Sequence, residues 1–147
     1  MIKFRLIDNR TRVSKRIREL EQKLEELPKE FMRLTADYII ELSPVDTGTY
    51  MDAHQIGETI APTNSRGKPR NQSYSDYAKW ARDRLYMQIE NLPKEDSKYF
   101  ISNNSQHAWR VEYQPETLKD SSKGAPYTLA RAKAPIFLEE ATRRVGL

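Results

Sequence analysis

The hexapeptide Ser-Pro-Val-Asp-Thr-Gly, at residues 43–48, stands where a long helical pattern stops. Upstream of it, apolar residues recur at alternating intervals of four and three positions, the period of one face of an α-helix. This stripe consists of Val13, Ile17, Leu20, Leu24, Leu27, Phe31, Leu34 and Tyr38. Pro44 has no amide hydrogen and disfavours the α conformation at Ser43, so the helix is expected to end there.

The residues after the proline predict a turn. An aspartate such as Asp46 accepts hydrogen bonds from amides just ahead of it, and Gly48 adopts a positive φ that other residues resist. We therefore predict a rigid corner built from Pro44, Asp46, Thr47 and Gly48. This corner would fix the angle between the helix and the segment that follows.

Asp-Thr-Gly is also the triplet of retroviral-type aspartic proteases, in which two chains each supply one Asp to a pair that shares a proton. That chemistry requires a small all-β fold with the triplet behind an apolar strand. Here the triplet follows a proline and a helical stripe, so a structural corner is the favoured interpretation.

The composition describes one polar domain. The chain has 147 residues, of which 37% are hydrophobic and 31% charged, and a mean hydropathy of −0.84. A chain of this length can bury a modest core, and its polarity fits a protein with extended arms or one stabilised partly by neighbours. It contains no cysteine, no apolar run long enough for a membrane span and no signal-peptide pattern at its start. Synthesis in the cytoplasm is the default expectation.

Two segments concentrate basic residues. Residues 1–18 hold seven bases and one acid, and residues 61–84 hold six bases and two acids. Such clusters can face nucleic acid or an acidic protein, although solvated surface faces produce the same pattern. The candidate interface residues in and beside the second cluster are Arg66, Lys68, Arg70, Trp80, Arg82, Arg84 and Tyr86.

The N-terminal third predicts a short edge strand at residues 2–7, where apolar and basic residues alternate, followed by the helical stripe. Pro28 predicts a break or bend at Leu27-Pro28, with a second helix running to about Leu42. A continuous coiled coil is the competing interpretation, but a proline in the middle makes a poor zipper. A helix packed on a sheet is favoured.

The middle third predicts strand-like runs at residues 49–51 and 56–60 and a polar loop at residues 61–72. Ser73 and Asp76 form a capping box that opens a helix ending near Leu92-Pro93. His54 looks exposed and, like His107, has no second ligand at metal spacing, so no metal site is expected.

The C-terminal third predicts a hairpin and a closing helix. The hairpin would pair residues 98–102 with residues 108–113, and a last strand would cover residues 127–132. Pro135 would lie in the first turn of the closing helix. The chain carries no Gly-rich phosphate loop, nucleophile elbow or His dyad, so we expect neither an enzyme nor a cofactor.

Several elements together resemble one family, the tail-completion or neck proteins of long-tailed bacteriophages, a gene-product-ten-like group that includes minor tail protein Z. The resembling elements are Leu27-Pro28-Lys29, the corner at 43–48, the paired asparagines of 99–104, Val111-Glu112-Tyr113 and Ala125-Pro126 before a C-terminal helix. Their order and spacing agree over most of residues 1–60 and 96–147. Gln114 departs from the pattern, which has glycine there.

The resemblance implies an α+β domain with a long helix on a small, mainly antiparallel sheet. Residues 61–95, a loop with a helix at about 74–92, look like an insertion into this single domain of residues 1–147. The resemblance also implies a structural virion protein, a ring of six copies at the head-proximal end of the tail. Its partners would be further copies, head-closure or connector proteins, tail terminator or tail tube proteins, and DNA in the lumen, with no membrane.

Two other classes of function stay open on the residues alone. The basic clusters suit a nucleic-acid-binding module without sequence specificity, and the apolar stripe suits a coiled-coil adaptor protein.

Overall fold

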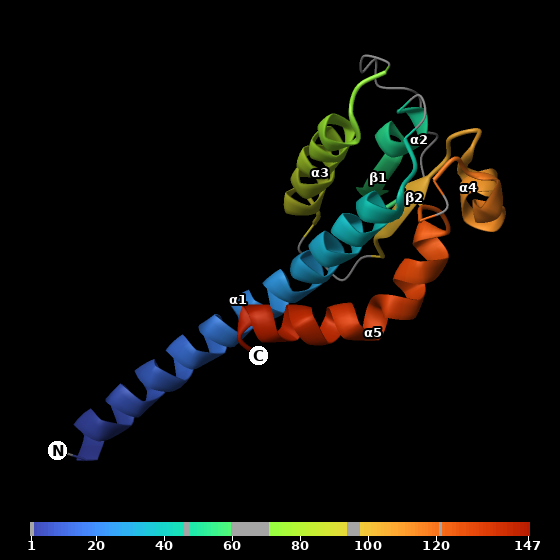
Figure 1. Ribbon diagram of the computed structural model, residues 1–147. Helices are drawn as coiled ribbons and strands as arrows, with labels where there is room; N and C mark the ends of the chain where they lie inside the picture. Colours follow the sequence, from blue (N-terminus) through green and yellow to red (C-terminus); the bar gives the residue numbers. More distant parts are fainter. Residues whose placement is uncertain (1, 46–47, 60–70, 94–97, 121) are drawn as a thin grey trace.

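The computed structural model describes residues 2–45, 48–59, 71–93, 98–120 and 122–147, with the backbone alone for residues 2–9 (Figure 1). It confirms the predicted α+β class with a long N-terminal helix and a C-terminal helix. The elements in chain order are α1 (Ile2–Leu42), α2 (Thr49–Asp52), β1 (His54–Gly57), α3 (Tyr74–Glu90), β2 (Phe100–Asn103), α4 (Ala108–Tyr113), a 3₁₀ turn (Pro115–Thr117) and α5 (Pro126–Val145).

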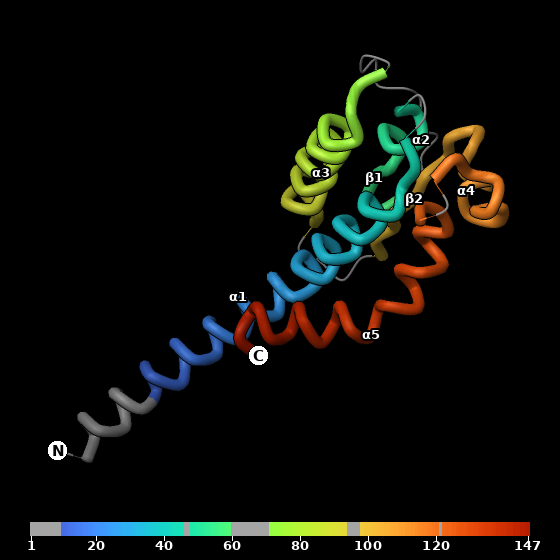
Figure 2. The backbone as a smooth tube through the Cα atoms, in the orientation of Figure 1, coloured from blue at the N-terminus to red at the C-terminus, as the bar shows by residue number. Residues whose placement is uncertain are grey.

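Helix α1 is the axis of the molecule. Its C-terminal half lies between α3 and α5, and its N-terminal half extends away from the rest of the chain (Figures 1 and 2). With 41 residues, it is about 60 Å long at the usual rise of an α-helix. The tertiary contacts of α1 are therefore concentrated at one end.

The sheet consists of β1 and β2, which pair antiparallel with His54 opposite Asn103 and Gly57 opposite Phe100. Two four-residue strands form a marginal unit in isolation. Helix α3 packs on β1, and the side-chain amide oxygen of Gln88 accepts a hydrogen bond of 2.8 Å from the amide of Ile56. The strand is thus stabilised by a helix as well as by its partner strand.

The hydrophobic core joins α1, α2, β1 and α3. Its buried members are Met32, Ala36, Ile40, Met51, Ile56, Tyr77, Ala81, Leu85 and Ile89. Those from α1 and those from α3 recur every four residues or so, as expected for helices that each bury one face. The helix inside the suspected insertion therefore supplies a large share of the core.

The structure describes Pro44 and Gly48, the two ends of the predicted corner. Helix α1 ends at Leu42, and Gly48 has φ of 83°. A Cβ atom at Gly48 would overlap the ring of Tyr77, so both conformation and space require glycine here. Asp46 and Thr47 lie outside the described residues.

The predicted strand at residues 2–7 is wrong, because these residues belong to α1. As part of one continuous helix, these residues use their backbone groups within α1 and not in a sheet. Helix α1 also runs through Pro28 without interruption, so the separate second helix does not occur. Contacts on both sides of the proline stabilise this segment: Lys23 bonds the carbonyl of Gly146, and Arg144 pairs with Glu30.

Three further strand predictions are wrong. Residues 49–51 lie in α2, residues 108–113 form α4 instead of the second strand of a hairpin, and residues 127–132 lie in α5. Of the second middle run, residues 56–60, only residues 56 and 57 lie in a strand, β1, which begins earlier at His54, and Ile60 lies outside the described residues. The aromatic and β-branched residues that favour strands are overridden by tertiary contacts.

Helix α5 begins at Pro126, nine residues before the predicted Pro135, which lies inside it. The carboxylate of Glu112 accepts hydrogen bonds from the backbone amides of Tyr127 and Thr128, at 3.2 and 2.6 Å. An acid that binds the free amides of a first turn stabilises the start of a helix. This contact from α4 explains why α5 starts so early.

Ser73 is the N-cap of α3, as the capping box predicts. The Ser73 hydroxyl accepts a hydrogen bond from the amide of Asp76 and donates one to its carboxylate, at 3.2 and 2.8 Å. Helix α3 ends at Glu90, close to the predicted end. The preceding loop, residues 61–70 with Arg66, Lys68 and Arg70, lies outside the described residues.

Candidate functional site

The most polar part of the interior is the His54 cluster, formed by Ser43, His54, Asn103 and Tyr127. Ser43 and His54 are 0% exposed. Ser43 directly follows α1, His54 begins β1, Asn103 ends β2 and Tyr127 lies in the first turn of α5. The cluster therefore ties together four elements that are distant in sequence.

The hydrogen bonds fix the tautomer of His54. The Ser43 hydroxyl donates to the carbonyl of Ile39 at 2.7 Å, so it accepts from Nε2 of His54, also at 2.7 Å. Nδ1 of His54 then accepts from the Tyr127 hydroxyl at 2.8 Å, with Nδ2 of Asn103 at 3.2 Å. Burial, aided by Arg84, lowers the pKa of His54 to about 3, so the ring is neutral.

A serine beside a histidine raises the question of nucleophilic catalysis. Here His54 donates to Ser43 and so cannot accept the hydroxyl proton as a general base would. Neither side chain is accessible to a substrate. The His54 cluster is therefore a structural joint.

The sequence alone makes His54 look exposed, and this prediction is wrong. The missed signal is that His54 and Ile56 share one face of a strand.

The candidate interface residues on α3 make contacts within the chain. Arg82 bonds the Asp37 carboxylate at 3.0 Å, and the Tyr86 hydroxyl donates to the same carboxylate at 2.7 Å. Burial and the nearby Asp37 raise the pKa of Tyr86 to about 12. Trp80 packs edge-on against Tyr77, with ring centroids 5.6 Å apart. These residues join α3 to α1 and to the core.

Arg84 points toward the sheet. Its guanidinium pairs with Asp52 at 3.0 Å and donates to the carbonyl of His54 at 2.9 Å. The side chain of Asp52 is 5% exposed and that of Arg84 is 16% exposed, so the ion pair is largely buried. Arg84 and Tyr86 thus lie on different sides of α3, and the structure does not bring the four named α3 residues together as one surface.

The exposed surface of α1 has an unusual composition. Val13, Ile17, Leu20 and Leu24 are between 50% and 57% exposed. The same stripe continues into the body of the protein, where Tyr38 packs against Phe137 of α5 at 5.3 Å. We call these four exposed residues the α1 stripe. A row of half-exposed large apolar side chains on an extended helix is typical of a surface that a partner covers.

Charge is divided along the same part of α1. Residues 10–18 are exposed and contain five bases and no acid, whereas residues 19–30 contain five acids and two bases. The bases are Arg10, Arg12, Lys15, Arg16 and Arg18, and the acids are Glu19, Glu21, Glu25, Glu26 and Glu30. Opposite charge therefore lies on successive segments of one helix.

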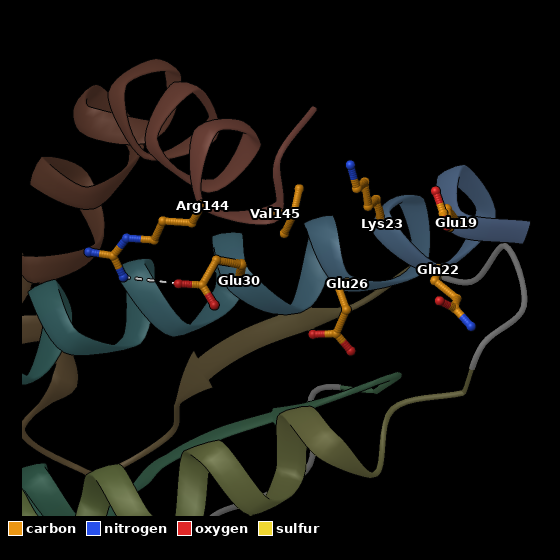
Figure 3. Close-up of a pocket in the computed structure, with 7 residues that line it drawn as sticks. All are labelled: Glu19, Gln22, Lys23, Glu26, Glu30, Arg144 and Val145. Atoms are coloured by element: carbon orange, nitrogen blue, oxygen red, sulfur yellow. Dashed lines mark hydrogen bonds and ion pairs between the residues drawn. The ribbon is translucent and has the colours of Figure 1, made fainter. Parts of the chain in front are cut away.

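A shallow groove of about 570 Å³ runs between the acidic segment and the end of α5. Figure 3 shows Glu19 and Lys23 on the side of α1 toward the end of α5, and Gln22 and Glu26 on another side. Arg144 of α5 pairs with Glu30 at 2.9 Å. The groove lies at the end of α5, and its α1 residues, between Glu19 and Glu30, overlap the C-terminal end of the α1 stripe at Leu20 and Leu24.

A smaller cavity of about 220 Å³ lies beside the corner, between Tyr50, Val111 and Leu118. It is below the usual size of a ligand site, and the guanidinium of its Arg110 already binds Thr117 at 2.9 and 2.8 Å. Within the described parts of the chain, no three His, Asp or Glu side chains gather closely enough to hold a metal ion. None of the described helices has the length and apolarity to cross a bilayer.

Comparison with protein-family models, curated proteins and solved structures finds no match to this chain.

Proposed function

We propose that this chain is a structural virion protein of the phage neck, a tail-completion subunit that forms a ring between the tail and the head connector. The observation that carries the proposal is the α1 stripe, four large apolar side chains at least 50% exposed on a helix that extends from the body. An assembly subunit that gains part of its burial from neighbours presents such a surface.

The resemblance described above adds to this observation. The family pattern has a helix that runs into an Ala/Ser-Pro-Val-Asp-Thr-Gly corner, and α1 ends at this corner with Gly48 in the left-handed region. The paired asparagines fall at the end of β2. One element departs from the expectation, because Val111-Glu112-Tyr113 lies in α4 and not in a strand.

The proposed mechanism is mechanical. The corner and the His54 cluster hold α1 at a fixed angle to the sheet and α5, and the extended half of α1 contacts a neighbouring subunit or an adjoining ring. The neighbours would be further copies of the chain, six in the complete ring, with connector proteins on one side and tail proteins on the other. The bases of residues 10–18 would meet acidic neighbours or the phosphates of DNA in the lumen.

A joining assay tests this proposal. Lysates of a phage with a stop codon in this gene should contain separate filled heads and complete tails, and added purified chain should restore joined, infectious particles. A variant with Ile17→Ser and Leu20→Ser should restore few particles, because the α1 stripe loses its apolar centre. A control variant, Lys79→Ser, changes an exposed residue on α3 and should restore normal numbers. Normal particles in the stop-codon lysate would overturn the proposal.

A second function is favoured by the exposed basic segment of α1, residues 10–18. A nucleic-acid-binding module would bind duplex DNA of any sequence through this segment, with affinity that falls steeply as salt rises. Fluorescence anisotropy with two unrelated duplexes separates this function from the first, since a neck subunit need not bind free DNA.

A further inference from the structure

We propose that two copies of this chain pair antiparallel through the α1 stripe when the protein is free in solution. The inference goes beyond the proposed function and does not depend on it. It rests on the match between the two halves of one exposed helix segment.

The first step concerns the apolar residues. The spacing of the α1 stripe is symmetric about a point between Arg18 and Glu19. In an antiparallel pair with its two-fold axis at that point, Val13 lies opposite Leu24 of the second copy, and Ile17 lies opposite Leu20. Every stripe residue thus obtains an apolar neighbour, in the alternating pattern of antiparallel helix packing.

The second step concerns charge. The same alignment lays the basic segment 10–18 of each copy along the acidic segment 19–30 of the other. On one flank of the stripe, helical geometry brings Arg12 near Glu26 of the second copy and places Arg16 between its Glu19 and its Lys23. Glu19 and Glu26 both line the groove beside the end of α5, together with Glu30, Lys23 and Arg144, so Arg12 and Arg16 of the partner approach a surface on which acids outnumber bases.

A parallel pair is less favourable. It would gain a contact between Arg16 and Glu21 but would place the two segments of five bases side by side. It would also put the two Arg10 side chains, which continue the stripe by position, against each other. Like charges in contact are repulsive, and here nothing on the stripe face offsets them.

The third step concerns consequence. A two-fold contact uses the same surface on both copies and therefore closes at two chains. In a subunit of a larger ring, such a pair would cover the apolar stripe and prevent further copies from adding until the chain reaches its docking site. The α1 stripe is half exposed in a single copy, so free monomers would be prone to aggregate.

Disulfide trapping tests the orientation, and the absence of native cysteine makes the result clean. Chains carrying Val13→Cys should crosslink with chains carrying Leu24→Cys when the two are mixed under mild oxidation. Val13→Cys alone should stay uncrosslinked, because an antiparallel pair separates the two copies of that residue by about 16 Å, beyond the roughly 7 Å limit for a disulfide. Efficient crosslinking of Val13→Cys with itself would overturn the proposal.

Charge reversal tests the complementarity. Sedimentation equilibrium of the full chain should give a dimer at about 0.05 M salt and a weaker dimer at about 0.5 M, because salt screens exposed charges. The pair Arg12→Glu and Arg16→Glu should give monomers, and adding Glu19→Lys and Glu26→Lys should restore the dimer. The control Arg131→Glu with Lys133→Glu, at exposed sites on α5, makes the same change in net charge and should leave the dimer intact.

The outcomes separate this inference from the neck proposal. Monomers of the native chain at both salt concentrations, or no rescue by the four-residue variant, would overturn the pairing and leave the joining assay unaffected. A dimer from a chain that fails to join heads and tails would support the pairing and overturn the neck function.

Discussion

Nε2 of His54 lies 2.7 Å from the hydroxyl of Ser43, and both side chains are completely buried. The bond joins the first residue after α1 to the first residue of β1 across the corner. Because Tyr127 bonds the other nitrogen of the same ring, the neutral imidazole connects α1, the sheet and α5.

Replacing His54 with leucine should lower the free energy of unfolding by about 3 kcal/mol, because Ser43 and Tyr127 would each lose a buried hydrogen-bond partner. Tyr127→Phe removes one hydroxyl and should cost about 1 kcal/mol. Urea unfolding followed by circular dichroism measures both values. Equal stability of His54→Leu and the native chain would show that the hydrogen bonds of the cluster contribute nothing to the free energy of unfolding.

The His54 cluster also makes stability depend on pH. The pKa of His54 falls from 6.5 to about 3 in the folded chain, so the unfolded chain binds the proton more readily. Stability is therefore full above pH 6.5 and is lost as pH falls toward 3, by up to about 1.4 kcal/mol per unit and roughly 5 kcal/mol in total.

Urea titrations at several pH values between 6.5 and 4.5 test this dependence. His54→Gln is the matched variant, because its amide can donate to Ser43 and accept from Tyr127 without titrating. Its stability should change less with pH than that of the native chain. If the stability of the two proteins changed equally with pH, the pH dependence would belong to groups other than His54.

Local signals in the sequence predicted the local features correctly. The end of α1 follows from Pro44, the start of α3 from the capping box at Ser73, and the positive φ from Gly48. Each of these depends on residues within a few positions of one another. Sequence reasoning is strongest for such features.

Several of the errors involve distant contacts. Residues 108–113 have strand-forming side chains, but they form α4, and β2 pairs with β1 from the middle of the chain. The burial of His54 depends on Tyr127, which is 73 positions away. The sequence does not reveal that Arg84 pairs with Asp52, because the two residues are 32 positions apart and no periodicity links them. Arg84 therefore looks like a candidate interface residue. Such pairings are set by the tertiary fold.

The buried ion pair of Arg84 and Asp52 predicts an asymmetric response to mutation. Arg84→Met should destabilise the chain by about 3 kcal/mol or more, because it leaves the buried Asp52 carboxylate without this cation. Arg84→Met combined with Asp52→Asn should cost clearly less than the sum of the single changes. A double-mutant cycle measured by thermal or urea unfolding gives the coupling. Additive effects would mean that the pair contributes no coupling energy.

The corner is tested by placing a side chain at Gly48. Gly48→Ala should lower the free energy of unfolding by about 2–4 kcal/mol, because alanine resists the φ of 83° and its Cβ would overlap the Tyr77 ring.

A second variant separates the effect of the φ angle from the effect of the overlap. Tyr77→Ala in the Gly48→Ala background removes the overlap and keeps the backbone strain. Tyr77→Ala should therefore lower the free energy of unfolding less in this background than in the native chain. Gly57→Ala is the matched control, since nothing lies closer than 3.8 Å to a Cβ built there. It should change stability by less than about 1 kcal/mol. If Gly48→Ala were as mild as Gly57→Ala, the angle between α1 and the sheet would not depend on a glycine at this corner.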